Sequence, residues 1–122
     1  MKLLIIIFLA LTFSQTAWSE TSGIKHVVLC WLNEPGDQSD IEAVMKASIK
    51  LKGISEVDSL VIGRPVPSDR KIVDDSFDIG LVLNFHSQKD LDIYLDHPEH
   101  VRRVKEALAP KCQRILVYDI AY

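Results

Sequence analysis

The chain has 122 residues, of which 48% are hydrophobic and 25% are charged, and its formal net charge is −3. This length holds one domain with a single core, and a net negative charge without a block of Lys or Arg argues against a nucleic-acid partner. The sequence has no nucleophile motif, phosphate-binding loop or dinucleotide fingerprint, which excludes most enzymes that are recognisable by motif and predicts no cofactor.

Residues 1–19 have the pattern of a secretory signal peptide. A basic second residue precedes an apolar run over residues 3–13, and small residues stand at positions 17 and 19. We expect cleavage between Ser19 and Glu20, which leaves a domain of residues 20–122. The run is shorter than the roughly 18–20 residues of a membrane-spanning helix. The mature protein is therefore expected to be exported, periplasmic or secreted, and free of the membrane; an uncleaved anchor is the alternative.

The first two elements are a strand and a helix. Residues 24–32, "IKHVVLCWL", are rich in β-branched and large apolar side chains, which predicts a strand that ends before Pro35 and Gly36. The segment from Ser39 to Glu42 has the Ser-x-x-Glu form of a capping box, which predicts a helix start. Apolar residues follow at three- and four-residue spacing until Gly53, the expected C-terminal cap.

Two further strands are predicted in the middle of the chain. Residues 56–64, "EVDSLVIGR", form the second strand, and residues 65–76 form a polar loop that we expect to be the most mobile segment. Residues 77–86, "FDIGLVLNFH", alternate between large apolar side chains and other residues, as a half-buried strand does.

The segment "YLDHPEH", residues 94–100, predicts a junction between two helices. Proline inside a helix lacks the amide donor and clashes with the preceding turn, but it is favoured at a first helical position. One helix is therefore expected to open at Ser87 and end near Asp96 or His97. A second helix starts at Pro98 and ends before Pro110, and residues 113–122, "QRILVYDIAY", form the last strand.

This order of elements predicts an α+β fold of the ferredoxin-like βαββαβ type, with a four-stranded antiparallel sheet and helices on one face. Both faces of the first strand are largely apolar: Val27, Leu29 and Trp31 alternate with His26, Val28, Cys30 and Leu32. The helices can cover only one face of the sheet. We therefore expect a homodimer in which a second copy covers the other face.

The chain resembles the stress-responsive A/B barrel domain family (Dabb), part of the dimeric α+β barrel superfamily. The resemblance covers essentially the whole mature sequence and is carried by the order and spacing of five segments: "IKHVVL", "VIGRPV", "FDIGLVLNF", "YLDHPEHV" and "ILVYDI". It implies two sheets that close into a barrel in a homodimer, with the helices outside.

Most members of this family have no assigned reaction. The resemblance to a plant branch that cyclises polyketide chains implies Tyr94 and His100 as a catalytic acid/base pair. That branch has a histidine on the third strand that faces the pocket, and this sequence has Ile79 in its place.

The residues themselves leave two interpretations of the junction open. Tyr94, His97 and His100 recur at three-residue spacing, and an imidazole and a phenol can exchange protons with a carbonyl substrate without a metal. In the structural interpretation, His97 caps the new helix, His100 bonds to a backbone group and Tyr94 fills the core. His-x-x-His supplies only two of the three or four ligands that zinc needs, so no metal site is predicted.

Three functions follow as hypotheses. The first is an exported, stress-related barrel that binds a small hydrophobic or aromatic molecule, with His26, Trp31, Ile79 and His97 as candidate ligand-binding residues. The second is a cofactor-independent cyclase, isomerase or monooxygenase-like enzyme that uses Tyr94 and His100. The third is a structural dimer without a ligand.

Cys30 and Cys112 are the cysteines of the exported part. In the predicted sheet the end of the first strand lies beside the start of the last strand, so the two residues come near each other. A bond also needs both side chains on the same face, which a one-residue slip in register would prevent. A disulfide and two buried free thiols are therefore both open.

Overall fold

The computed structural model describes residues 23–122, and the predicted signal peptide lies outside these residues. Its elements, in chain order, are β1 (Ile24–Leu32), α1 (Gln38–Ser48), the 3₁₀ turn η1 (Ile49–Gly53), β2 (Ser59–Gly63), β3 (Ile79–Phe85), α2 (Gln88–Asp96), α3 (Pro98–Arg103), the π-helical turn η2 (Val104–Leu108) and β4 (Cys112–Ala121). None of the helices within residues 23–122 has the length and apolar character that a membrane crossing requires.

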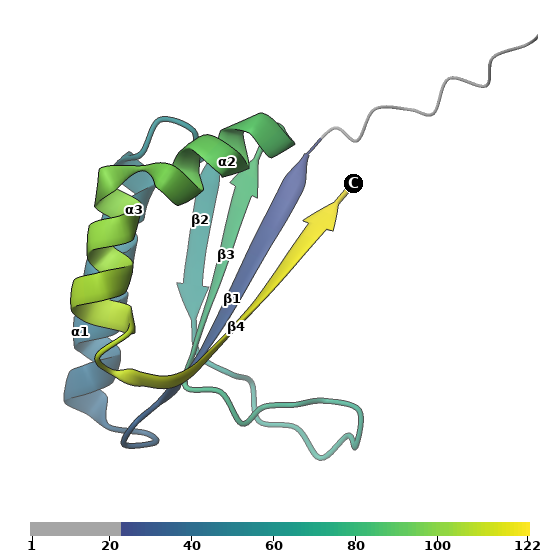
Figure 1. The fold of residues 1–122 in the computed structure, drawn as a ribbon. Helices are drawn as coiled ribbons and strands as arrows, with labels where there is room; N and C mark the ends of the chain where they lie inside the picture. The colour runs from purple at the N-terminus through teal and green to yellow at the C-terminus, as the bar shows by residue number, and fades with distance from the viewer. Residues whose placement is uncertain (1–22) are drawn as a thin grey trace, which may run out of the picture.

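The four strands form one antiparallel sheet in the order β2-β3-β1-β4. All the helices lie on the same face of this sheet (Figure 1). This is the ferredoxin-like arrangement that the sequence predicts, and it leaves the opposite face of the sheet without a cover from its own chain. We call that opposite face the open face.

The core lies between the sheet and the helices. The alternate residues of β1 and β3 that face the helices are at most 7% exposed. Ile41 and Val44 of α1 and Leu91 of α2 pack against them and are also buried. Burial of each Val, Leu, Ile or Phe side chain among them stabilises the fold by about 1.5–3 kcal/mol relative to an exposed position.

Helix α1 begins earlier than the capping box predicts. Its N-cap is Asp37, whose carboxylate accepts a hydrogen bond of 2.8 Å from the Asp40 amide, and Ser39 lies inside the helix. The turn before it contains Gly36 at a φ of 78°, a conformation that favours glycine, and this turn brings Asp37 to the cap position. The α-helix then ends at Ser48, and the 3₁₀ turn η1 carries the chain to Gly53.

The helix junction forms as predicted. The Ser87 hydroxyl caps α2 by accepting a hydrogen bond from the Asp90 amide, and α2 ends at Asp96. Pro98 takes the first position of α3, where its missing amide donor has no helical partner to lose. Tyr94 and His100, which stand on either side of this break, can therefore both face the sheet.

A disulfide joins Cys30 of β1 to Cys112 of β4. Of the two alternatives that the sequence leaves open, a disulfide or two buried free thiols, the structure contains the disulfide. The pairing of the two strands explains how the two side chains come to share a face. Trp31 pairs with Arg114 but Leu32 pairs with Cys112, so Gln113 is an extra residue in a β-bulge. Without that extra residue Cys112 would fall on the face opposite to Cys30, because successive side chains alternate between faces.

Candidate functional site

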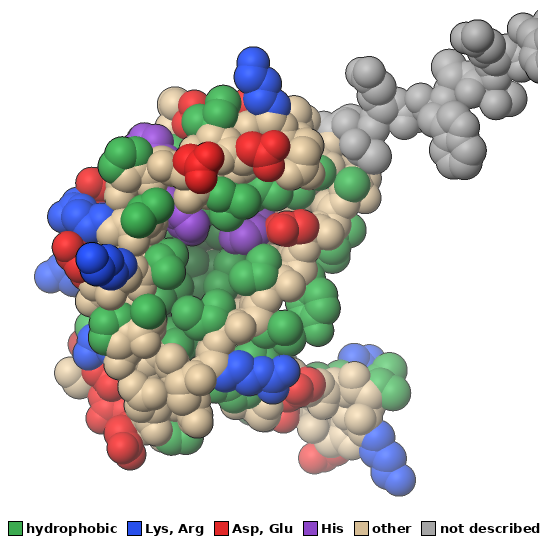
Figure 2. Space-filling model, in the orientation of Figure 1, with side chains coloured by type: hydrophobic (Ala, Val, Ile, Leu, Met, Phe, Trp, Pro, Cys, Tyr) green, Lys and Arg blue, Asp and Glu red, His purple; other side chains and the backbone are tan. Residues whose placement is uncertain are grey.

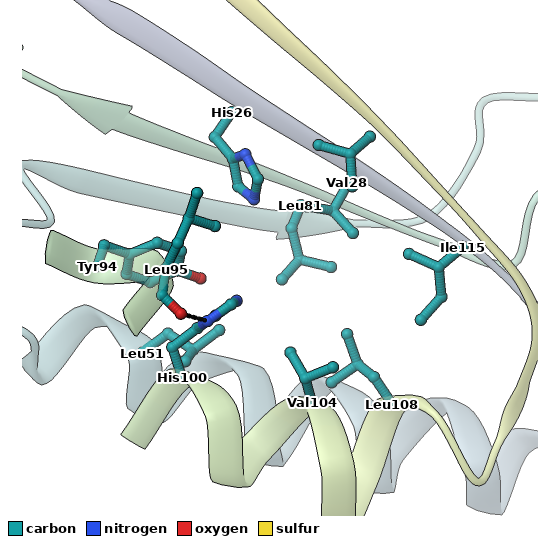
Figure 3. A pocket seen from close by; sticks show the side chains of 11 residues that line it. His26, Val28, Leu51, Leu81, Tyr94, Leu95, His100, Val104, Leu108 and Ile115 are labelled. Carbon is teal, nitrogen blue, oxygen red and sulfur yellow. Dashed lines mark hydrogen bonds between the residues drawn. The ribbon is translucent and has the colours of Figure 1, made fainter. Parts of the chain in front are cut away.

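A cavity of about 220 Å³ lies between the sheet and the segment formed by α3 and η2. In the space-filling view it is a hollow with apolar walls and histidine side chains at one end (Figure 2). Figure 3 shows the side chains that line it, which are His26, Val28, Leu51, Leu81, Tyr94, Leu95, His100, Val104, Leu108, Ile115 and Val117.

The walls of the cavity are apolar because they come from core-facing positions. Val28 of β1 and Leu81 of β3 point at the helices from adjacent strands. On β4, however, Ile115 and Val117 also point toward the helix side but are 37% and 42% exposed. The helices therefore do not fully cover β4, and the cavity opens to solvent along this strand.

The polar end of the cavity contains a buried histidine paired with an aspartate. His26 is 5% exposed, and its Nδ1 lies 2.5 Å from Oδ1 of Asp119, its cross-strand neighbour on β4. A carboxylate can only accept a hydrogen bond, so Nδ1 carries the proton. The Nε2 atom of neutral His26 is then an acceptor, on a ring that points into the cavity (Figure 3).

Tyr94 and His100 lie together beside His26. The ring centroids of Tyr94 and His100 are 4.4 Å apart, and those of Tyr94 and His26 are 5.9 Å apart. Nδ1 of His100 lies 2.9 Å from the carbonyl oxygen of Leu95, which only accepts, so this nitrogen also carries a proton. As Figure 3 shows, the second nitrogen of His100 faces the cavity.

Burial sets the protonation of two of these groups. It raises the pKa of Tyr94, because the phenolate would lose its hydration, so the hydroxyl stays a donor. Burial is also the main cause that lowers the pKa of His100, against the opposing effect of the hydrogen bond to Leu95. A positive charge on His26 or His97, in the protonated form of either ring, acts in the same direction and lowers the pKa of His100 further. His100 is therefore neutral near pH 7 and presents a lone pair to the cavity.

These three side chains can recognise a small polar group within an apolar pocket. Tyr94 supplies a hydroxyl donor, while His26 and His100 each supply an imidazole nitrogen that accepts in its neutral form. A carbonyl oxygen could bond to Tyr94, and a hydroxyl or an acidic C–H could approach either histidine. Within the described residues, no cluster of three or more His, Cys, Asp or Glu side chains is arranged to hold a metal ion.

The structure brings together only some of the predicted site residues. Tyr94, His100 and His26 line the cavity, whereas Ile79, Trp31 and His97 do not. Ile79 is fully buried beside Cys30, two positions along β3 from Leu81, which is the residue of that strand at the cavity. The position of Ile79 therefore gives no support to a ligand contact.

Trp31 and His97 have structural partners instead. Trp31 lies on the open face, where its indole N–H donates to the Ser76 hydroxyl. The ring of His97 caps α3, because its Nδ1 accepts a hydrogen bond of 3.1 Å from the Glu99 amide. These positions do not support the predicted role of either residue in ligand binding at the cavity.

Asp119 is the site residue that the sequence does not single out. It is one of many exposed acidic residues, and its side chain is 45% exposed even in the ion pair. The alternation of β4 would place it on the helix side, but its pairing with His26 depends on the register between β1 and β4, which the bulge at Gln113 shifts.

Comparison with known proteins identifies relatives of the whole domain. Residues 24–122 match the family model described as Stress responsive A/B Barrel Domain. A stress-response A/B barrel domain-containing protein of Arabidopsis thaliana is 29% identical over 96 residues, which cover 79% of this chain but only 35% of that protein. The chain thus spans about a third of this curated relative.

Two solved structures share the fold. A dimeric ferredoxin-like protein of unknown function from Thermobifida fusca is 21% identical, with a TM-score of 0.67 over 91% of this chain and 100% of the other. A hydroxynitrile lyase from Passiflora edulis is 20% identical, with a TM-score of 0.72 over 84% of this chain and 94% of the other. At these identities, the likeness concerns the fold alone.

Proposed function

Because the chain belongs to the stress-responsive A/B barrel domain family, we propose that it is an exported homodimer that binds a small hydrophobic or aromatic molecule in the cavity beside α3. The observation that carries this proposal is a cavity of about 220 Å³ with apolar walls and three polar side chains at one end. A cavity of about 150 Å³ can hold benzene, so a single substituted ring suits this volume. The ligand class is therefore a small ring or short chain that bears a carbonyl or hydroxyl group.

Native mass spectrometry of protein purified from its own host tests the binding proposal. We expect a co-purified small molecule on the wild type and on Val101→Trp, because Val101 is 51% exposed and is not a cavity residue. Val104→Trp on the same helical segment should abolish it, because the added ring fills the cavity. A wild type that carries no ligand and retains none from a panel of phenols and aryl ketones would leave only a structural role for the dimer.

A second candidate function is cofactor-independent proton transfer, as in a cyclase or an isomerase. It is favoured by the neutral His100 beside the Tyr94 hydroxyl, at a centroid distance of 4.4 Å between the rings. In such a reaction Tyr94 would donate a hydrogen bond to a developing enolate oxygen, and Nε2 of His100 or His26 would take the proton from carbon. The Passiflora lyase shares only the fold, so these residues support the candidate and the relative does not.

Tyr94→Phe separates binding from turnover. The Tyr94 hydroxyl has no hydrogen-bond partner among the described residues, and Phe preserves the ring, so the fold should tolerate the change. If the protein is an enzyme, exchange of the ligand's acidic protons for deuterium should slow by about 100-fold, a typical contribution of one acid or base group. Equal exchange rates for wild type and variant, with the ligand still bound, would reject Tyr94 as a catalytic residue.

The open face supports the proposal of a homodimer. Its side chains are those that alternate away from the helices, and they include Val27, Leu29, Val61, Val82, Tyr118 and Ile120. Val61, Tyr118 and Ile120 are 64%, 53% and 51% exposed in the single chain. An apolar patch of this kind usually marks an interaction surface, and a second identical sheet matches it.

Export is supported by two independent features of the chain. The first is the signal-peptide pattern of residues 1–19. The second is the disulfide between Cys30 and Cys112, a bond that persists in oxidising compartments and is rare in the cytosol. N-terminal sequencing of protein from the exported fraction should find Glu20 as the first residue; Met1 at that position would contradict cleavage.

A further inference from the structure

The connection between β2 and β3, residues 64–78, is much longer than the about 2–5 residues that usually join adjacent antiparallel strands. In Figure 1 it leaves the end of the sheet and extends to the side away from the helices. Figure 2 shows it standing clear of the body of the molecule. We call residues 64–78 the arm.

Two large apolar side chains on the arm are exposed to solvent. Val66 is 80% exposed and Ile72 is 91% exposed, and these are the highest values among the large hydrophobic side chains of the described residues. A single exposed apolar residue is common on a protein surface. Two of them on one protruding loop, with little contact to their own chain, indicate a surface that a partner covers.

Hydrogen bonds within the arm hold it in shape without a partner. The Ser68 amide donates to the Asp75 carboxylate at 2.8 Å, which links the two sides of the arm. At the tip, the Val73 amide donates to the Arg70 carbonyl at 3.0 Å. Binding by a preformed loop loses less conformational entropy than binding by a disordered loop. The arm is therefore suited to pack against another surface.

The root of the arm is attached to the open face of the sheet. Trp31, whose side chain lies on that face, donates through its indole N–H to the Ser76 hydroxyl at 2.9 Å. The ring of Phe77 meets the ring of Trp31 edge-on, with the centroids 6.3 Å apart. The arm thus continues the open face beyond the end of the sheet.

We propose that the arm packs against a second copy of the chain and buries Val66 and Ile72 there. This inference rests on the proposed homodimer. Two sheets that pack face to face lie about 10 Å apart, so a loop that extends past the open face on that side runs alongside the partner. The arm carries charges of both signs, among them Asp69, Arg70, Lys71 and Asp74, so identical copies would not repel each other at this contact.

Sedimentation velocity of the purified protein over a wide concentration range tests the inference. The double variant Val66→Ser, Ile72→Ser should raise the dimer dissociation constant by about tenfold or more. The matched control is Lys71→Ser, an exposed change at the tip of the arm that removes no apolar side chain and should leave the constant within about twofold of the wild type, because exposed charges contribute little. Circular dichroism at a dilution where every protein is monomeric should give the same spectrum and melting temperature, because both apolar side chains are largely exposed.

The outcomes separate the arm from the dimer itself. A wild type that dimerises with the same constant as the double variant would overturn the inference and leave the homodimer standing. A wild type that stays monomeric at every concentration would overturn the homodimer and the arm contact together. A weaker dimer in the double variant but not in Lys71→Ser supports the arm contact.

Discussion

His100 should make the stability of the protein depend on pH. Burial lowers the pKa of its imidazole below the ordinary value of 6.5, so the unfolded chain binds this proton more readily than the folded protein does. The contribution of His100 is therefore fully present above pH 6.5, and it is lost as pH falls through the lowered pKa of the folded state. Urea unfolding near pH 7.5 and near pH 5 measures the difference in the free energy of unfolding.

The control for this effect is His100→Gln, which removes the titrating group but retains a donor for the Leu95 carbonyl. Between pH 7.5 and pH 5 the free energy of unfolding should fall less for the variant than for the wild type. The variant lacks the His100 contribution, whereas the contributions of the other titrating groups are the same in both proteins. An equal loss in the two proteins would show that His100 does not carry the effect.

His97 should matter for helix α3 and not for the ligand. His97→Ala removes the acceptor for the Glu99 amide and should lower the free energy of unfolding by about 0.5–2 kcal/mol, as the loss of an N-cap does. His97→Asn supplies another capping acceptor and should restore most of it. Neither change should alter ligand retention in native mass spectrometry; loss of the ligand in both variants would return His97 to the binding site.

At the scale of single residues, the sequence predicts the members of the site that are close along the chain. Tyr94 and His100 flank the same proline, so their meeting follows from local helix geometry. Ile79 and Leu81 share one face of a strand, and alternation alone cannot tell which of them lies over the cavity, because that depends on where α3 and η2 dock. Asp119 meets His26 only through a long-range register.

At the scale of elements, the residues that end a helix or a strand, such as proline and glycine, decide how accurately its bounds are predicted. The strand over residues 24–32 is predicted at its observed bounds, because an apolar β-branched run ends where the turn around Pro35 and Gly36 begins. The second strand is shorter than predicted, Ser59–Gly63 in place of residues 56–64, because the chain makes a turn at Ile54–Val57 before it pairs with β3. The bulge at Gln113 has no local signal in the sequence.

Removal of the disulfide should destabilise the whole domain. The bond closes a loop with a sequence separation of 82, and a loop of that length corresponds to about 4 kcal/mol in the chain-entropy model. The double variant Cys30→Ala, Cys112→Ala should lose a free energy of unfolding of this order, measured by urea titration. A single variant should lose as much, because one cysteine cannot form the bond.

Thiol counting supplies the independent check on the disulfide. Exported protein, denatured without reductant, should show no reactive thiol and should run as a monomer on a non-reducing gel. Two reactive thiols per chain would contradict the bond, and the variants would then report only the loss of packing around Cys30, which is fully buried.

For the whole molecule, two isoleucines offer a matched test of the proposed homodimer. Ile120 on the open face and Ile49 on the helix side are 51% and 49% exposed, so a change at either removes a similar amount of exposed apolar surface. Ile120→Lys should shift the protein toward monomer in light scattering, because it places a charge in the proposed interface. Ile49→Lys should leave the mass unchanged; an equal effect of both changes would argue against the open face as the interface.

The cavity and the open face lie on opposite sides of one sheet. In a dimer formed through the open faces, two sheets would separate the two cavities, and no cavity residue would belong to the interface. With no contact shared between the two cavities, we expect occupation of one to leave the affinity of the other unchanged, so that saturation follows a simple hyperbola with one ligand per copy. Association of the copies and capture of the ligand would be free to change independently in evolution.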